Sequence, residues 1–250
     1  MSQNLYANLD GKIALVTGAG LGIGSALSRA LGRLGVTVIC ASRTQDDIDE
    51  VAEQIADDGG KALAVPTDVT RPDQIESLAN AINDNFGKLD LAFLNAGGNL
   101  QQDSILDSDI DEWRAAIELN LYSVFYGIRA VAPLMKKAGG GRIVLTGSAM
   151  AHYPAENYSS YCVAKAGARM LVNTAALELI TDNITLNEFI PGPTRTLQAM
   201  KGVSEDNVSS PFNNPAEWVK EPEDVVDMLL TIAAYPGMGP TGQKFSLARR

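Results

Sequence analysis

Tyr161 and Lys165 are the residues whose types and spacing could carry acid–base chemistry. They stand four positions apart in a segment with helical periodicity, so both side chains project from one helix face. A phenol has an ordinary pKa of about 10, and an adjacent ammonium group favours the phenolate. The pair could therefore exchange a proton with a carbonyl or alcohol oxygen. Taken alone, this spacing is better explained by an ordinary exposed helix face.

A glycine-rich turn, Thr17-Gly-Ala-Gly-Leu-Gly-Ile-Gly24, separates an expected strand from an expected helix. Its backbone can approach a pyrophosphate closely, and the helix N-terminus stabilises negative charge there. The turn therefore predicts a dinucleotide site that includes Gly18, Leu21, Gly22, Ile23 and Gly24. Its spacing differs from the commoner Gly-x-Gly-x-x-Gly pattern, and glycines also serve tight turns without a ligand.

Ser42 and Arg43 end the second expected strand, at the position that selects the cofactor in dinucleotide folds. An acidic residue there binds the ribose 2′-hydroxyl, whereas an arginine accommodates a 2′-phosphate. The strand end carries no carboxylate, and a guanidinium pairs well with a phosphate. The sequence therefore favours NADP(H) over NAD(H); the alternative is a solvated arginine.

Short apolar runs alternate with longer segments of helical periodicity, which predicts an α/β fold with a parallel sheet and helices on both faces. The expected strands are Lys12–Val16, Val36–Ala41, Ala62–Pro66, Leu89–Leu94, Arg142–Thr146, Thr185–Ile190 and Gln243–Leu247. The expected helices are Ile23–Leu34, Asp46–Asp58, Pro72–Phe86, Ile110–Met135, Tyr158–Ile180 and Glu223–Ala233. No linker or repeat divides residues 1–250, so one domain is expected. The long segment 191–221, rich in Pro, Asn and Ser, predicts a substrate lid.

Composition excludes several classes of function. The 250 residues are 46% hydrophobic, enough for a large core, and carry a net charge of −10, which disfavours nucleic acid and anionic membranes as partners. No apolar run reaches the roughly 20 residues needed to cross a bilayer, and the N-terminus lacks a targeting pattern, so a soluble cytoplasmic protein is expected. Cys40, Cys162 and the single His152 form no recognisable metal-ligand set, so no metal is expected.

Together these motifs resemble those of the short-chain dehydrogenase/reductase family, over nearly the whole chain. The matching features occur in order: the glycine turn, Asp68-Val69, Asn95-Ala-Gly97, Asn120, Ser148, Tyr161-x-x-x-Lys165 and Pro191-Gly-Pro-Thr-Arg-Thr196. The resemblance implies a Rossmann-like, doubly wound sheet. All the motifs then fall at the carboxyl ends of strands or in the helices beside them, where such sheets bind ligands.

The resemblance also implies a role for each residue. Tyr161 is the proton donor in reduction and the acceptor in oxidation, Ser148 hydrogen-bonds the substrate oxygen, Lys165 lowers the tyrosine pKa and holds the nicotinamide ribose, and Asn120 supports a water relay to Lys165. Cofactor contacts are expected from Asp68 and Val69 to the adenine, from Asn95, Ala96 and Gly97 along the groove, and from Pro191, Gly192, Thr194 and Thr196 near the carboxamide. A homotetramer through the two long helices is implied too, although the C-terminal residues 245–250 depart from the family pattern.

The predicted activity is NADP(H)-dependent interconversion of a carbonyl and a secondary alcohol. A neutral small-molecule substrate is favoured because the segment 196–218 carries no cluster of positive charge. An NAD-dependent alcohol dehydrogenase and a 3-oxoacyl-thioester reductase are alternatives. A non-catalytic dinucleotide sensor is a remote one, because Ser148, Tyr161 and Lys165 are all present. His152 could contact substrate, but Tyr161 already supplies the acid–base group, so His152 is outside the predicted catalytic set.

Overall fold

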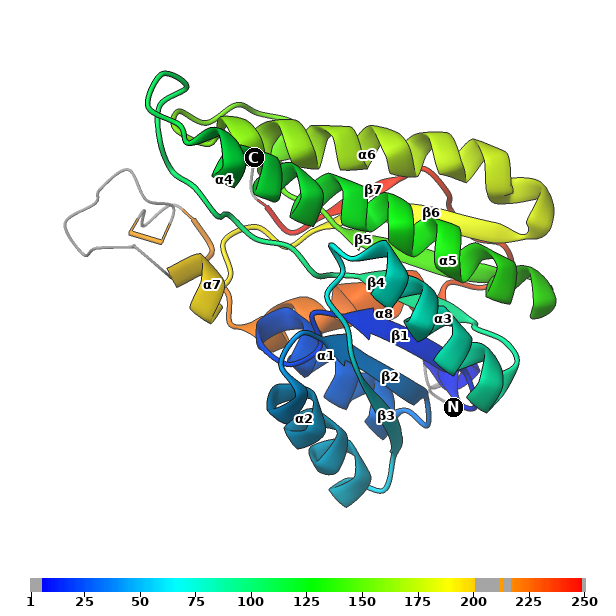
Figure 1. The fold of residues 1–250 in the computed structure, drawn as a ribbon. Coiled ribbons are helices and arrows are strands. Elements are labelled where there is room, and N and C mark those ends of the chain that lie inside the picture. The colour runs from blue at the N-terminus through cyan, green and yellow to red at the C-terminus, as the bar shows by residue number, and fades with distance from the viewer. Residues whose placement is uncertain (1–5, 201–211, 214–216, 249–250) are drawn as a thin grey trace.

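One seven-stranded sheet organises the chain, and a computed structural model describes residues 6–200, 212–213 and 217–248 of it (Figure 1). The strands are β1 (Ile13–Thr17), β2 (Thr37–Ser42), β3 (Lys61–Pro66), β4 (Leu91–Leu94), β5 (Gly141–Thr146), β6 (Ile184–Ile190) and β7 (Lys244–Ser246). They pair in parallel in the order β3-β2-β1-β4-β5-β6-β7. Every residue of β1, β4 and β6 is buried, as expected for strands covered on both faces.

Helices cover both faces of the sheet. The main helices are α1 (Gly22–Arg33), α2 (Gln45–Asp57), α3 (Pro72–Phe86), α4 (Ile110–Ile117), α5 (Ser123–Lys137), α6 (Ser159–Leu179), α7 (Leu197–Met200) and α8 (Val226–Ala234). Two apolar clusters fill the core: α1, α2 and α8 pack on one face, and α3, α5 and α6 on the other (Figure 1). The predicted doubly wound α/β fold is confirmed.

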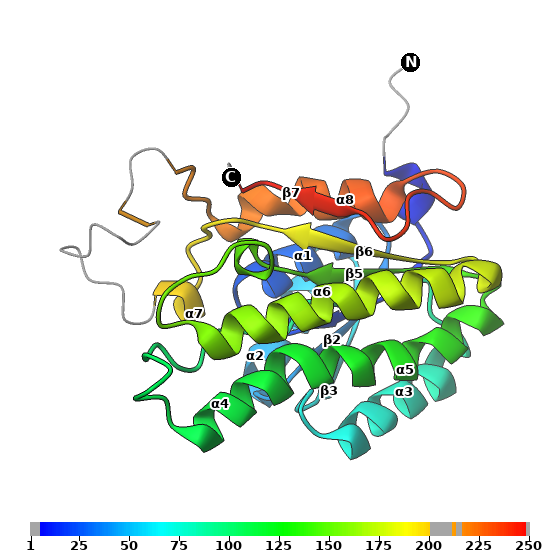
Figure 2. The ribbon, with the colours of Figure 1, turned by 90° about the horizontal axis from the view of Figure 1, so that it is seen from above.

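The strand order reverses between β1 and β4, which pair directly. Ligands of open α/β sheets bind beside this reversal, beyond the carboxyl ends of the strands. Figure 2 shows α7 and the starts of α4 and α6 gathered at this same edge of the sheet. The fold therefore brings the loops after β1, β4 and β5 together with the N-terminal end of α6.

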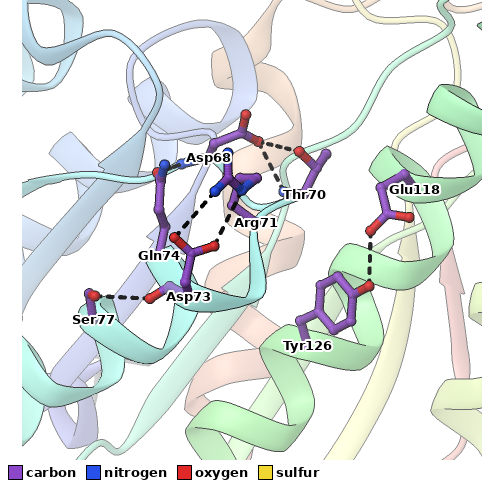
Figure 3. A network of polar contacts seen from close by, with 8 residues as sticks. All are labelled: Asp68, Thr70, Arg71, Asp73, Gln74, Ser77, Glu118 and Tyr126. Atoms are coloured by element: carbon purple, nitrogen blue, oxygen red, sulfur yellow. Dashed lines mark hydrogen bonds and ion pairs between the residues drawn. The ribbon is translucent and has the colours of Figure 1, made fainter.

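The predicted uninterrupted helix Ile110–Met135 is wrong at one turn. Between α4 and α5 lies a π-helical turn, η2 (Glu118–Tyr122), which contains Asn120. The Asn120 Nδ2 donates to the Ala116 carbonyl over 3.0 Å, so the side chain occupies the acceptor that a regular helix offers to the backbone four residues later. Tyr126 bridges the widened turn by donating to Glu118 over 2.9 Å (Figure 3). Single π turns of this kind often occur at functional sites.

The other predicted elements are confirmed within a few residues, and short helical turns were missed. Among these are η1 (Ala7–Leu9), η3 (Ala149–Ala151), η4 (Ile180–Asp182) and α7, whereas η5 (Pro222–Val225) and α8 together make up the predicted helix Glu223–Ala233. Much of the predicted lid, 191–221, lies outside the described residues, so the lid stays a prediction. Its two ends are joined, because the Arg195 N–H donates to Lys220 O over 2.7 Å and the Lys220 N–H to Pro193 O over 3.0 Å. No helix in the described part of the chain combines the length and apolarity of a membrane span.

Asp90 ties β1 to β4 at the opposite, amino-terminal edge of the sheet. Its Oδ2 accepts from the Ile13 N–H over 3.0 Å, and Lys12 and Lys88 each lie 3.2 Å from its carboxylate. Burial acts to raise the pKa of Asp90, but the hydrogen bonds from Ile13, Lys12 and Lys88 outweigh it and hold the pKa below its ordinary value. The ionised carboxylate therefore stabilises the junction of the two central strands.

We expect Asp90→Asn to lower the free energy of unfolding at pH 7 by about 1–3 kcal/mol. Because the folded pKa is depressed, this contribution is present above the unfolded pKa of about 3.9 and is lost as the pH falls through the folded value. Urea denaturation of the parent and of Asp90→Asn, at pH 7 and near pH 3, should show that the difference between their free energies of unfolding becomes smaller in acid. Asp58→Asn is the control, because Asp58 pairs with Arg33 at the surface. A difference in free energy of unfolding that does not change with pH would contradict a stabilising role of the ionised Asp90 carboxylate.

Candidate active site

Helix α6 places Tyr161 and Lys165 at the carboxyl edge of the sheet. The Lys165 side chain is buried, with 4% of the residue exposed, and its Nζ donates to the carbonyl of Thr146, the last residue of β5, over 3.0 Å. The Nζ also lies 5.7 Å from the centroid of the Tyr161 ring. Because the ammonium group is held by a strand end, its position relative to the phenol is fixed by the sheet.

Asn120 and Lys165 meet at Gly97, which lies in the loop after β4. A Cβ on Gly97 would lie 2.9 Å from Asn120 Oδ1 and 3.1 Å from Lys165 Nζ. Asn120 is itself held by Gly98, whose N–H donates to Oδ1 over 3.0 Å and whose carbonyl accepts from Nδ2 over 2.8 Å. The structure therefore brings Asn120, Lys165 and Gly97 together, as the sequence predicted.

Ser148 follows β5 and begins the short helix η3. Its Oγ accepts from the Met150 N–H over 3.2 Å, and its side chain lies near enough to Tyr161 to act on the pKa of the phenol. All four residues of the predicted catalytic set, Asn120, Ser148, Tyr161 and Lys165, thus lie around one point, delivered by η2, the β5–η3 turn and α6.

The pKa values of Tyr161 and Lys165 contradict one expectation, that Lys165 lowers the pKa of Tyr161. Burial raises the pKa of Tyr161 above its ordinary value, although the nearby Ser148 side chain acts against this. The predicted lowering of this pKa by Lys165 is therefore not found: the ammonium group points to Thr146 O, and burial lowers the pKa of Lys165 itself to about 8. At neutral pH, Tyr161 carries its proton, the form that a general acid requires.

Thr17, the last residue of β1, joins the strand ends beside this cluster. Its Oγ1 accepts from the N–H groups of Asn95 and Ala96, each over 3.0 Å, and donates to Phe93 O over 3.4 Å. The Asn95 side chain donates to Thr17 O over 3.1 Å and accepts from Thr146 Oγ1 over 3.0 Å. Thr17 and Thr146 were not among the predicted site residues. The one feature of the sequence that could have indicated them is a threonine at the end of a buried strand.

The glycine turn after β1 fits a pyrophosphate closely. Gly18 has φ +65°, and a Cβ there would lie 3.1 Å from Ala96 Cα. A Cβ on Gly24 would collide with the Gly18 carbonyl, so Gly24 permits close packing of α1 on the turn. The first turn of α1 carries no acidic residue, and its N-cap is the exposed Leu21. This backbone cradle with a helix N-terminus fits an anionic dinucleotide.

Thr196 lies against the glycine turn, because a Cβ on Gly22 would be 2.9 Å from its Cγ2. The Thr196 hydroxyl accepts from the Ala199 N–H over 3.1 Å at the start of α7, and Thr194 is buried behind it. The predicted segment Pro191, Gly192, Thr194 and Thr196 therefore faces the same edge as the glycine turn. Val69 and Ala96 line a small apolar cavity together with Thr17.

Charged side chains surround the end of β2. Arg43 is exposed there, and a Cβ on Gly20 would lie 3.2 Å from Ser42 Oγ and 2.7 Å from the Cβ of Asp47. Asp47 belongs to the first turn of α2, so a carboxylate does lie beside the glycine turn, although the strand end has none. Asp47 was not predicted as a site residue, because it reaches this position only through the turn of the chain after β2.

Asp68 closes a turn after β3 (Figure 3). Its Oδ1 accepts from the Thr70 N–H over 3.0 Å and from the Thr70 hydroxyl over 2.7 Å. Burial acts to raise the pKa of Asp68, but the Thr70 hydrogen bonds and the charges of Arg43 and Arg71 outweigh it and lower the pKa. The structure thus gives Asp68 a turn-capping role and sets it near Arg43; its contact with adenine stays a prediction.

Tyr161, Ser148 and Lys165 lie at the carboxyl edge of the sheet, where the glycine turn also lies. In the residues that the structure describes, no three His, Cys, Asp or Glu side chains are grouped to hold a metal ion. A phenol with its proton, beside a hydroxyl and an ammonium group, supports acid–base chemistry.

Comparison with known proteins agrees with this geometry. The sequence profile of the family described as short chain dehydrogenase matches residues 12–207. The chain is 32% identical to 7alpha-hydroxysteroid dehydrogenase of Escherichia coli (strain K12), covering 97% of this chain and 94% of that protein. It is 30% identical to cyclohexanol dehydrogenase of Acinetobacter sp. (strain SE19), covering 98% and 96%. A solved structure of 7alpha-hydroxysteroid dehydrogenase complexed with NADH and 7-oxo glycochenodeoxycholic acid superposes with a TM-score of 0.92 at 30% identity, over 99% of this chain and 97% of that one.

Proposed function

Because the chain belongs to the short-chain dehydrogenase family of oxidoreductases, which act on hydroxyl and carbonyl groups, we propose that it interconverts a neutral ketone and a secondary alcohol with NADP(H). The observation that carries this proposal is the convergence of Lys165 and Asn120 on Gly97, next to Tyr161 and Ser148. The named relatives act on a hydroxysteroid and on cyclohexanol, so a secondary hydroxyl on a saturated ring is the substrate class that we propose to test first.

In the proposed reduction, Ser148 and Tyr161 hold the carbonyl oxygen, and Tyr161 donates its proton as negative charge develops there. When bound, the reduced nicotinamide supplies the hydride. Burial of Tyr161 keeps the phenol protonated at neutral pH, which suits this direction. Lys165, held by Thr146 O, keeps its ammonium group beside the Tyr161 ring, where it can bind the cofactor's ribose.

Cofactor selectivity rests on two opposed charges at the end of β2. Arg43 is exposed there and favours the 2′-phosphate of NADP(H). Asp47 lies beside Gly20 and Ser42, and its negative charge favours NAD(H) instead. We propose NADP(H) because a guanidinium can contact the phosphate directly, and we keep NAD(H) as the second candidate on the position of Asp47.

We expect Tyr161→Phe to fold and to bind NADPH with an affinity within about threefold of the parent, but to lose about 10²–10⁴-fold in kcat, because only the proton donor is removed. The measurements are NADPH fluorescence titration and the reduction of cyclohexanone, a neutral ketone. Tyr158→Phe, one helical turn earlier, is the matched control and should keep its activity. If Tyr161→Phe retained more than a tenth of the parent kcat, the proposed role of Tyr161 would be wrong.

Two variants at the end of β2 test the cofactor proposal. Arg43→Glu should weaken NADPH about ten- to hundredfold, since a charge-assisted contact is lost, and leave NADH within about threefold. Asp47→Asn should strengthen NADPH by about two- to fivefold, because a nearby negative charge is removed. Titration of each variant with both reduced cofactors gives the four constants. If the ratio of the dissociation constants for NADPH and NADH were unchanged in Arg43→Glu, NAD(H) would replace NADP(H) as the proposed cofactor.

We also propose that the protein forms a homo-oligomer through the outer face of α5 and α6, a tetramer if it follows the family. Val163, Met170 and Leu177 are spaced seven residues apart on α6, so they share one face, and they are 52%, 61% and 80% exposed. Phe125 on the adjacent α5 is also 46% exposed. Large apolar side chains that are exposed at a regular spacing along one helix face favour a protein–protein contact.

Met170→Glu should therefore lower the mass of the particle in sedimentation velocity, because a charge would be buried in the contact. Met238→Glu, at an exposed position after α8, is the control and should leave the mass unchanged. A parent protein that sediments as a 26.5 kDa monomer would contradict the proposal.

A further inference from the structure

A carboxylate lies in the fully buried strand β6. Glu188 is 2% exposed, and every residue of β6 is buried. A buried charge is costly unless it is paired, and an apolar side chain of similar volume often stabilises a fold better. The strand itself therefore gives no reason for a glutamate at this position.

The Glu188 carboxylate is held on one side and unsatisfied on the other. Its Oε2 lies 3.0 Å from His152 Nε2 and 3.8 Å from Arg169 Nε. Its Oε1 is buried and finds no hydrogen-bond partner among the described residues. The side chains of Glu188 and His152 are only 3% and 10% exposed, whereas that of Arg169 is 39% exposed, so His152 is the main partner.

Glu188 Oε1, the oxygen without a hydrogen-bond partner among the described residues, lies against the backbone between Thr146 and Ser148. A Cβ on Gly147 would collide with Glu188 Oε1, so this oxygen faces the backbone between Thr146 and Ser148. Thr146 supplies the carbonyl that holds Lys165, and Ser148 begins the turn that His152 ends. Glu188 is thus placed to act on the two backbone positions on which the site depends.

Charge connects Glu188 to Lys165 as well. Burial lowers the pKa of Lys165 to about 8, and the negative charge of Glu188 acts to raise it. The groups that face Glu188 from the packed elements are His152 after η3 and Lys165 and Arg169 on α6. On the neighbouring strands its register partners are the apolar, buried Leu145 of β5 and the exposed Lys244 of β7.

We propose that Glu188, held by His152, is a positioning residue, whose buried carboxylate lies behind the backbone that holds the Lys165 ammonium group and whose bond to His152 fixes the turn that carries Ser148. Its role rests on the proposed function, since it acts through Lys165 and Ser148. In this proposal, His152 holds Glu188 and the turn that carries Ser148, and it takes no part in proton transfer to the substrate. This role of Glu188 also accounts for a charged residue in a strand whose residues are all buried.

The direct test is an NMR titration of Lys165, in protein whose lysines carry ¹³C at the ε carbon. The Lys165 signal is identified by its absence in Lys165→Arg. We expect a parent pKa of about 8. Glu188→Gln keeps the volume and the acceptor for His152 but removes the charge, so we expect the pKa of Lys165 to fall by about one pH unit. Arg169→Gln is the matched control and should move it far less, because Arg169 is more exposed.

A Lys165 pKa that is the same in Glu188→Gln and in the parent would overturn the electrostatic part of the proposal. This readout needs neither substrate nor cofactor, so it stands even if Tyr161→Phe disproves the proposed function. In an active enzyme, the alkaline limb of the kcat/KM profile for cyclohexanone should move down with the pKa.

Two variants of His152 test the positioning of Ser148 and serve also if Glu188→Gln does not fold. His152→Gln keeps an N–H that can donate to Glu188, and it should retain most of the activity. His152→Leu cannot donate, so we expect at least a tenfold loss in kcat with NADPH affinity unchanged. Equal activity of the two variants would show that the bond between His152 and Glu188 does not position the turn.

Discussion

The hydrogen bond from the buried Lys165 ammonium to the Thr146 carbonyl is the interaction on which the site depends. It joins α6 to the end of β5, and this fixes the distance from the ammonium group to the Tyr161 ring at 5.7 Å. The room for Lys165 comes from Gly97, whose position a larger residue could not occupy without displacing Nζ. The sheet reversal between β1 and β4 brings these loops to one edge, so fold and site share one geometric cause.

Burial then sets the protonation states. It raises the pKa of Tyr161 and lowers that of Lys165 to about 8, so the pair at neutral pH is a neutral phenol beside an ammonium group. This is the state in which a proton can be given to a carbonyl oxygen. The negative charge of Glu188, behind the same turn, acts to raise the pKa of Lys165. We propose that this effect on the site offsets the free energy needed to bury the carboxylate in β6.

Periodicity and turn chemistry were enough to predict the strands, most helices and the edge at which the site lies. Short apolar runs gave strands such as β1 and β6, because a parallel sheet covered on both faces needs them. The π turn at Asn120 could not be predicted, because it depends on a side chain competing for the Ala116 carbonyl within a good helical pattern. The Thr17 contacts, the place of Asp47 and the pairing of Glu188 with His152 each join segments distant in sequence or turned in space, which spacing alone does not reveal.

The central claim is that a buried ammonium group at Lys165 organises proton transfer by Tyr161. It is tested most directly by the pH dependence of kcat/KM for ketone reduction by the parent enzyme, measured between pH 6 and about 10.5. We expect activity to be lost with an apparent pKa of about 8, as Lys165 loses its proton. A profile that stays level until about pH 10, where an unperturbed lysine and tyrosine titrate, would contradict it.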